Sequence, residues 1–390
     1  VGEISDNSGI RGFAEFTVDG GAVNVNGNVL MADRTNMFAA VNLNGGYLAA
    51  NTVTRGVRPG SVALVNFDGG ALKARTIGNL FGTGANAPDA VNVYAGGALF
   101  DTTNLDCTVA VPLLAPTGSG VASIAVTPRG GYIGPPMVTI TGGGGTGATA
   151  IAQFDSNSGT VNGILMTSPG FGYTSAPSVA LSYGGTNIHA TLGAVSRTAN
   201  TSGGLFKLGS GSLSLTATNT YGGATTVSNG TLRIGVREAL PANSALTIVG
   251  GNLNLGGFAY TNNTVSATVG GVLNGALNTP AFVKNGSGTL LLTAALSSSA
   301  PIQINEGTVR LQAAQPGLYE APVAGAFNTT DPMTTSIVTR LTTRMANIVY
   351  TDMYSPKEVF IGLAKEGGFR HYEYYDAPAD APSPWTYHGD

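Results

Sequence analysis

The sequence is poor in cysteine, in charge and in long apolar runs. Cys107 is the only cysteine among 390 residues, which excludes an internal disulfide and a metal site built from cysteines. Charged residues make up 10% of the chain, and the net charge of −3 gives no reason to expect a nucleic acid or an anionic membrane as partner. No run of about 18 uninterrupted apolar residues is present, so we expect no insertion into a membrane.

Glycine and apolar residues are abundant instead. The chain has 58 glycines, 43% hydrophobic residues and a mean hydropathy of +0.17. Disordered chains usually combine low hydrophobicity with high net charge, so this composition predicts a buried core. The glycines then predict repeated turns that need a positive φ.

The first quarter of the chain repeats one pattern: an alternating strand, a Gly-Gly turn and a second strand. The copies are FTVDGGAVNV, VNLNGGYLAA, VNFDGGALKA and VNVYAGGALF, and their turns follow each other at intervals of 25, 24 and 27 residues. Separate hairpins would not explain this period, whereas coils stacked on one another would. The predicted structural turn residues are Asp19, Gly20, Gly21, Asn44, Gly45, Gly46, Asp68, Gly69, Gly70, Gly96 and Gly97.

The residues before these Gly-Gly pairs are expected to be structural. Asp19 and Asp68 occupy equivalent positions, and Asn44 replaces them in the coil between. Asp and Asn side chains both bond to nearby backbone in turns, but Asn cannot act as an acid or a base. We therefore assign these three residues to turn formation rather than to chemistry.

In residues 203–312 the repeat interval is shorter. Glycines at positions 211, 230, 251, 271, 288 and 307 precede strands rich in Leu or Val, 17 to 21 residues apart. Side chains two residues apart face the same way, so Leu213 and Leu215 can line one inner wall, as can Leu232 and Ile234. Such coils bury their apolar walls only when they stack.

Residues 203–235, GGLFKLGSGSLSLTATNTYGGATTVSNGTLRIG, resemble the autotransporter-associated β-strand repeat, or passenger-associated transport repeat, of bacterial surface proteins. The matching positions are Lys207, Gly209, Gly211, Leu213, Leu215, Asn219, Tyr221, Gly222, Thr225, Gly230 and Leu232. A degenerate second copy at 283–311 keeps Lys284, Gly286, Gly288 and Gly307 but lacks the Asn-Tyr-Gly-Gly middle. The resemblance implies a parallel β-helix on an exported bacterial protein, extracellular or at the cell surface, and it carries no catalytic residues.

Between the two repeat regions lies a duplication. Residues 121–150 align with residues 162–190 at an offset of 41, which matches Tyr132 with Tyr173 and Pro136 with Pro177. The pattern resembles a Gly-Tyr/Ala-Pro repeat of large bacterial surface proteins and tail-fibre-like proteins. We expect a β insertion in the solenoid.

The last 78 residues are rich in aromatic and acidic side chains. The candidates for self-association are Phe369, Arg370, His371, Tyr372, Tyr374, Tyr375, Trp385 and Tyr387, because rigid rings bury contact area at low entropic cost. His371 and His388, with Glu373, Asp376 and Asp380, lack the spacing of a metal site, so a cap or a subunit contact is favoured. Residues 335–348 have helical spacing of apolar residues, but their threonines favour a strand nearly as much.

The sequence thus predicts an all-β chain, a right-handed parallel β-helix (β-solenoid) with a two-copy β-repeat insertion and an atypical C-terminal cap. The expected divisions are 1–115 and 201–312 for the solenoid, 116–200 for the duplicated region, and 313–390 for the cap and an extended interaction tail. Residues 121–312 contain only three acids, Asp155, Glu238 and Glu306, so no carboxylate cluster and no enzymatic activity is expected there.

The predicted function is a structural subunit of an extracellular fibre, sheath or surface layer, which self-associates through its solenoid ends and C-terminal tail. The expected partners are copies of the chain itself, with no cofactor and no metal. The alternative is an adhesin or glycan-binding passenger domain, with surface glycans as ligands. Such a domain would present an aromatic groove, for which Tyr47, Tyr94, Tyr221 and Tyr260 are the candidates. A carbohydrate-cleaving enzyme ranks third.

Overall fold

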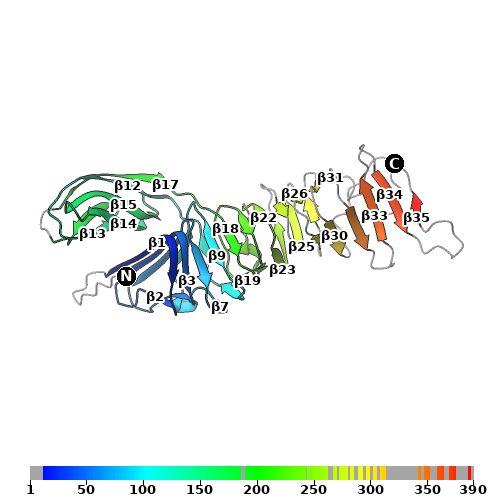
Figure 1. Cartoon of the computed structure of the whole chain (residues 1–390), viewed down its shortest axis with the longest axis horizontal. Coiled ribbons are helices and arrows are strands. Elements are labelled where there is room, and N and C mark those ends of the chain that lie inside the picture. Colours follow the sequence, from blue (N-terminus) through cyan, green and yellow to red (C-terminus); the bar gives the residue numbers. More distant parts are fainter. Residues whose placement is uncertain are drawn as a thin grey trace. The chain divides into compact units, whose positions relative to one another are not determined.

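Parallel coils stacked on one another form a β-solenoid of about 10 turns in the computed structural model (Figure 1), and this confirms the predicted fold class. The structure describes residues 12–185, 189–242 and 244–255, and beyond 255 the backbone of the strands alone. The described helices are two 3₁₀ turns, η1 (Gly84–Asn86) and η2 (Arg237–Ala239). None of the described helices is long and apolar enough to cross a membrane.

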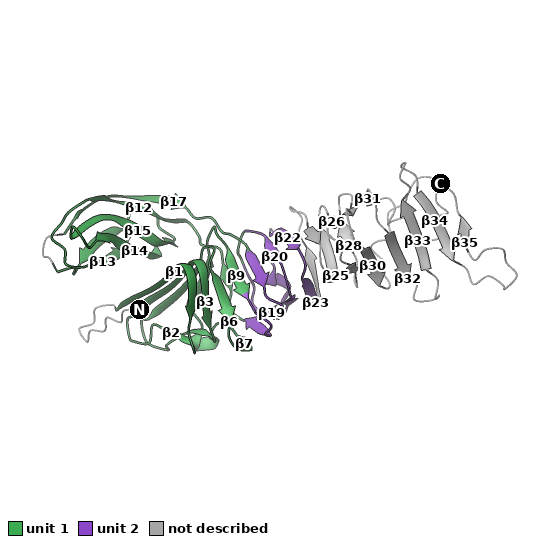
Figure 2. Ribbon diagram, in the orientation of Figure 1, with its two compact units in different colours: residues 1–100, 110–204, 220–222 green, residues 101–109, 205–219, 223–390 purple. Residues whose placement is uncertain are grey.

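The chain divides into two compact units (Figure 2). Unit 1 comprises residues 1–100, 110–204 and 220–222, and unit 2 comprises residues 101–109, 205–219 and 223–390. The coil strands of unit 1 are β1 (Phe13–Asn24), β2 (Val29–Met31), β3 (Phe38–Ala50), β4 (Val53–Arg55), β5 (Val62–Phe67), β6 (Ala71–Ala74), β7 (Gly78–Asn79), β8 (Ala90–Val93), β9 (Ala98–Asp101) and β11 (Leu113–Leu114).

The coils of unit 1 stack in parallel and in register. The first half of β3 pairs with β1 on one side and with β5 on the other, so that Val41 lies between Phe16 and Val65. Strand β5 pairs in turn with β8, and β8 with β11. The second half of β3 pairs with β6, and β2 pairs with β4. Consecutive Gly-Gly turns therefore lie one above another, as their spacing predicts.

Alternating residues of these strands fill the inside of the coils. One inward row consists of Leu43, Phe67 and Val93, which are paired with one another across neighbouring strands, and all three are fully buried. Side chains two residues apart on each strand face the same inner side. The Phe67 ring packs against those of Phe81 and Phe100, with centroids 6.5 and 5.2 Å away. This aromatic cluster is the centre of the core of unit 1.

The duplicated segment forms an antiparallel insertion within unit 1. Its strands are β12 (Ser119–Thr127), β13 (Met137–Thr141), β14 (Thr146–Asp155), β15 (Thr160–Phe171), β16 (Ser178–Ser182) and β17 (Thr191–Ala199). The order β15-β14-β13-β16 makes one sheet, and β12 with β17 makes another. The first strand of each repeat thus pairs with the last strand of the other, and the middle strands pair with each other.

This exchange gives the insertion an approximate two-fold symmetry. Thr139 pairs with Ala180, its own equivalent at the offset of 41, and the pairs on either side are related by the same symmetry. The matched tyrosines Tyr132 and Tyr173 are both buried, each in its own apolar cluster. The Tyr132 hydroxyl accepts a hydrogen bond from the Ala190 backbone N–H at 2.6 Å. The duplication is therefore one interlocked body rather than two domains in series.

Apart from the pairs among the last four, the strands of unit 2 also pair in parallel, in shorter coils. They are β10 (Cys107–Val109), β18 (Leu205–Leu208), β19 (Ser212–Leu215), β20 (Thr225–Val227), β21 (Thr231–Ile234), β22 (Leu246–Ile248), β23 (Asn252–Thr261), β24 (Ala267–Val269), β25 (Val272–Thr279), β26 (Phe282–Lys284), β27 (Thr289–Leu292), β28 (Leu296–Ser298), β29 (Ile302–Ile304), β30 (Thr308–Gln312), β31 (Leu341–Thr343), β32 (Asn347–Thr351), β33 (Glu358–Leu363), β34 (Phe369–Tyr374) and β35 (Trp385–Tyr387).

The inner wall predicted for unit 2 is present. Leu213 pairs with Leu232 and Leu215 with Ile234, and all four side chains are buried. Strands β32 to β35 pair antiparallel, unlike the coils before them. Within 335–348, the described backbone consists of β31 and the start of β32, so the helical alternative for this segment is wrong there, and the threonine-rich strand interpretation holds.

Truncation of the aromatic cluster tests the solenoid core. We expect Phe67→Ala to lower the free energy of unfolding by about 3–5 kcal/mol, because it removes a fully buried ring and leaves a cavity. Chemical denaturation followed by circular dichroism measures the change. Ile77→Ala, at a side chain that is 72% exposed, is the control and should leave stability nearly unchanged. Equal effects of the two substitutions would contradict this core.

Candidate functional site

A ladder of asparagines runs along the outer face of the first coils. Asn42, Asn66 and Asn92 occupy equivalent positions on β3, β5 and β8 and are 0–2% exposed, although their neighbours Leu43 and Phe67 point into the core. The Asn92 amide donates to Asn66 Oδ1 at 2.9 Å, and the Asn66 amide donates to Asn42 Oδ1 at 2.8 Å. The buried side-chain amides of neighbouring coils thus satisfy one another's hydrogen-bonding groups.

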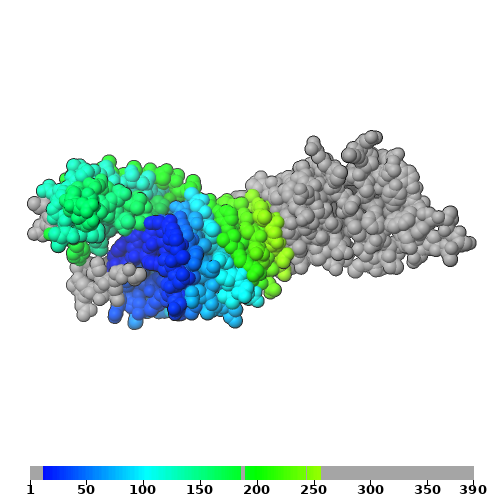
Figure 3. Space-filling model, in the orientation of Figure 1, coloured from blue at the N-terminus to red at the C-terminus, as the bar shows by residue number. Residues whose placement is uncertain are grey.

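The insertion covers this ladder. The Asn42 amide also donates to Thr149 Oγ1 at 3.0 Å, and the hydroxyls of Thr149 and Thr167 lie 2.8 Å apart. The Asn44 amide donates to the Thr167 carbonyl at 2.9 Å. Tyr94, on the same outer face, is 3% exposed, and burial raises the pKa of its phenol. The polar row therefore lies at an internal interface between the coils and the insertion. Figure 3 shows the outer surface of the coils and of the insertion in their different colours.

The turn residues hold neighbouring coils together. Asp68 Oδ1 accepts the backbone N–H of Gly96 at 2.6 Å, and Asp19 Oδ1 accepts the Asn44 amide at 2.9 Å. Each carboxylate thus serves the turn of the following coil, which agrees with a turn role for these residues. A Cβ on Gly96 would lie 2.5 Å from the Asp68 carbonyl carbon, so close stacking requires glycine there.

The ladder ends at β1 in Glu15. This carboxylate accepts the Thr17 hydroxyl at 2.8 Å and the Asn42 amide at 3.1 Å. Strand β1 pairs with β3 on one edge, and no other described strand pairs with it. Among the described residues, the N-terminal edge of unit 1 is therefore the 12-residue strand β1, and one row of its backbone groups pairs with no described strand.

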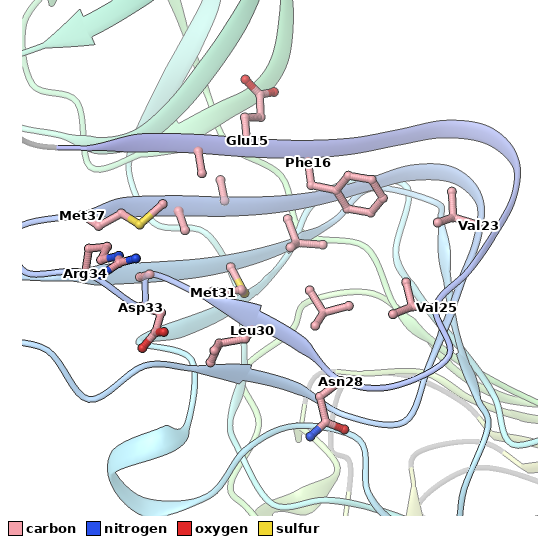
Figure 4. Close-up of a pocket in the computed structure, with 16 residues that line it drawn as sticks. Glu15, Phe16, Val23, Val25, Asn28, Leu30, Met31, Asp33, Arg34 and Met37 are labelled. Carbon is pink, nitrogen blue, oxygen red and sulfur yellow. The ribbon is translucent and has the colours of Figure 1, made fainter. Parts of the chain in front are cut away.

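Two cavities open at this end of unit 1. One, of about 540 Å³, lies inside the first coil, where Figure 4 shows Phe16, Val23, Val25 and Met31 around it and Glu15 pointing away from it. The other, of about 710 Å³, lies between β1 and the insertion. Its lining comprises Phe13, Glu15, Pro135, Pro136, Met137, Val138, Ala150, Ile151, Ala152, Phe154 and Tyr183.

A buried lysine joins two coils of unit 2. Lys207 is 0% exposed, and its Nζ donates to the carbonyls of Leu208, Gly209 and Asn229 at 2.7, 2.8 and 3.1 Å. Burial lowers the pKa of its ammonium from 10.5 to about 8, and the nearby Asp101 carboxylate opposes this shift. Lys207 therefore fastens the glycine turn of one coil to the turn of the next.

Reactive groups do not gather in the described part of the chain. No group of three or more His, Cys, Asp or Glu that could hold a metal ion occurs among the residues that the structure describes. The thiol of Cys107 is buried, and burial raises its pKa to about 11. The Arg55 guanidinium pairs with Asp89, whose other oxygen accepts the Ala63 N–H at 2.7 Å.

The predictions for the aromatic residues, for self-association and for a glycan-binding groove, have different outcomes. The self-association candidates lie on or beside β34 and β35, and their side chains fall outside the described residues, as does that of Tyr260. Tyr94 and Tyr221 are buried, so they cannot form an exposed aromatic groove, and that expectation is wrong for these two. Tyr47 is partly exposed, and the Lys73 ammonium lies 5.1 Å from its ring centroid.

The Asn ladder and the role of Lys207 were not predicted. The signal for the ladder is visible in VNLN, VNFD and VNVY, where an asparagine recurs between two apolar residues. A polar residue at an outward strand position is ordinarily a surface residue, and only the cover supplied by the insertion makes it internal.

A family comparison fits this architecture of stacked repeat coils. The passenger-associated-transport-repeat family model matches residues 205–234 and 282–311, in agreement with the two copies seen in the sequence. The chain carries two of these repeats, which imply a passenger domain of an autotransporter-type surface protein. No curated protein and no solved structure gives a significant match to the chain.

Asn66→Ala tests the ladder. We expect a loss of about 2–4 kcal/mol in the free energy of unfolding, because the substitution leaves buried groups of both Asn42 and Asn92 without a partner. Asn104→Ala, at an exposed turn residue of unit 2, is the control. Urea denaturation of both variants measures the difference, and a neutral Asn66→Ala would show that the ladder does not stabilise the fold.

Lys207→Met tests the lysine contacts at two levels. The substitution should cost about 2 kcal/mol or more, because three buried carbonyls lose their donor. Between pH 8 and 10.5 the unfolded chain holds the Lys207 proton more tightly than the folded chain, so this residue makes stability rise with pH. The wild type should therefore gain stability relative to Lys207→Met from pH 7.5 to 9.5. A pH-independent difference in urea midpoint would contradict the shifted pKa.

Proposed function

We propose that the chain is a non-catalytic structural subunit of an extracellular fibre, sheath or surface layer, exposed on the bacterial surface and assembled from copies of itself. The observation that carries this proposal is the N-terminal edge of unit 1. The backbone edge of β1 and the apolar interior of its coil have no partner among the described residues. Such an edge is a template for pairing with another chain.

The construction of the coils supports a mechanical role. Successive coils are joined by backbone hydrogen bonds between paired strands, by rows of packed aliphatic side chains and by the Asn ladder. These repeated contacts resist distortion of the solenoid. The transport repeats support an exported location, since they belong to passenger domains of surface proteins.

The glycan-binding alternative has less support. It rests on aromatic side chains displayed on one face, because stacking on sugar rings requires an accessible ring. Tyr94 and Tyr221 are 3% and 1% exposed, and the exposed Tyr183 lies in the insertion rather than on the coils. We therefore favour the scaffold over the adhesin.

Assembly of the purified chain tests the proposal. We expect the protein to form oligomers or filaments whose mass rises with concentration, visible by negative-stain microscopy and sedimentation velocity. A glycan array run in parallel tests the alternative. Strictly monomeric protein across the accessible concentration range, together with specific glycan binding, would overturn the scaffold in favour of the adhesin.

A further inference from the structure

The insertion has an apolar core of its own. One of its clusters contains Tyr132 and Val161, the other contains Val121 and Tyr173, and every buried member of both lies within residues 121–190. The aromatic cluster of the coils lies inside the solenoid instead. Apolar packing therefore holds the insertion together as a body without help from the coils.

Hydrogen bonds between polar groups join this body to the coils. The Asn42 amide donates to Thr149 Oγ1 at 3.0 Å. The Asn44 amide donates to the Thr167 carbonyl at 2.9 Å. Leu64 of β5 adds an apolar contact with the backbone of β14. Two bodies that each have their own core, and that meet through polar contacts, can move relative to one another.

The contact also leaves one buried group unsatisfied. Tyr94 is 3% exposed and lies beside Ser168 and Tyr173 of the insertion. Its hydroxyl has no partner at hydrogen-bond distance among the described residues. Burying such a group costs free energy, which is recovered when water reaches it. Tyr94 therefore favours separation of the insertion from the coils.

The Asn ladder keeps its own hydrogen bonds without the insertion. The bonds from Asn92 to Asn66, from Asn66 to Asn42 and from Asn42 to Glu15 all join coil strands. Of the ladder bonds described above, the one to Thr149 crosses to the insertion. Water can replace that acceptor, so the ladder stays intact when the insertion moves away.

The chain enters and leaves the insertion at one narrow neck. Residues 115–118 lead into β12, and the chain returns from β17 at Asn200. The Asn200 N–H donates to the Gly118 carbonyl at 2.9 Å, so the two connections lie side by side. The Ser202 hydroxyl donates to the Val93 carbonyl at 2.9 Å, which fixes the chain to the coils again. Rotation of the insertion thus requires changes at a few backbone positions.

We propose that the insertion is a hinged cover, which opens as one body about the neck at Gly118 and Asn200 and exposes the Asn ladder and Tyr94 to solvent. The closed form hides the ladder. The open form presents its amides on the outer face of the coils at intervals of about 4.8 Å, the spacing of neighbouring strands. This inference goes beyond the proposed function, and it applies to a single copy of the chain.

Nitration of tyrosines by tetranitromethane, mapped by peptide mass spectrometry, tests the cover. Tyr94 should react in the folded protein more slowly than Tyr183, which is 64% exposed. It should react about tenfold or more faster than Tyr132 and Tyr221, which are 4% and 1% exposed, because local opening is more frequent than unfolding. Tyr132 reports unfolding of the insertion and Tyr221 reports unfolding of the coils.

Thr149→Val tests the contact that holds the cover closed. The substitution keeps the shape of the side chain but removes the hydroxyl that accepts the Asn42 amide. We expect nitration of Tyr94 to become about three- to tenfold faster, because the closed form loses a buried hydrogen bond. Tyr132 should stay unreactive. Thr191→Val, at an exposed threonine of β17, is the matched control and should react like the wild type. Circular dichroism verifies that both variants fold.

Three results would overturn the hinged cover. Equal rates for Tyr94 and Tyr221 would mean that Tyr94 is reached through unfolding of the coils. Equal rates for Tyr94 and Tyr132 would mean that the insertion unfolds instead of opening as one body. A rate at Tyr94 that Thr149→Val does not change would mean that this contact does not keep the cover closed.

The urea dependence of the same rates is a second measurement. Opening of the cover exposes less surface than unfolding, so nitration of Tyr94 should rise less steeply with urea than nitration of Tyr221. Identical slopes for the two tyrosines would also contradict the proposal.

Discussion

Backbone pairing between successive coils is the constraint on which the rest of this structure depends. A single coil has no interior of its own, because its apolar side chains face a space that only its neighbours close. Phe16, Val41 and Val65 form one continuous row only when three coils lie in register. The glycine turns follow from the same requirement, since a side chain at Gly45 or Gly96 would separate adjacent coils.

The insertion makes the outer face of the first coils internal. Without it, Asn42, Asn66 and Asn92 would form a polar surface row, as outward residues of a solenoid ordinarily do. With it, their amides are buried and must bond to one another and to Thr149. Its exchange of strands between the two repeats joins its two sheets into one body, so it covers the coils as a unit.

Much of this architecture could be predicted from the sequence. The Gly-Gly interval, the alternation of Leu213 with Leu215 and the Lys-Gly-Leu pattern of the repeats depend on residues close together in the chain, and all three led to the correct fold. The ladder cover could not be predicted in this way, because Asn42 and Thr149 are 107 residues apart and no local pattern links them. The role of Lys207 was hidden for a similar reason, since its third acceptor, Asn229, belongs to the next coil.

The Asn ladder also gives the first coils an electrical direction. Every amide in it donates toward the N-terminal coil, from Asn92 to Asn66 to Asn42, so the side-chain dipoles are aligned rather than alternating. Aligned hydrogen bonds polarise one another, and the positive end of this series reaches Glu15, where a carboxylate rather than a fourth amide receives it. The two directions along the coils are therefore chemically unequal, and any strand that approaches from the Glu15 side meets an acceptor.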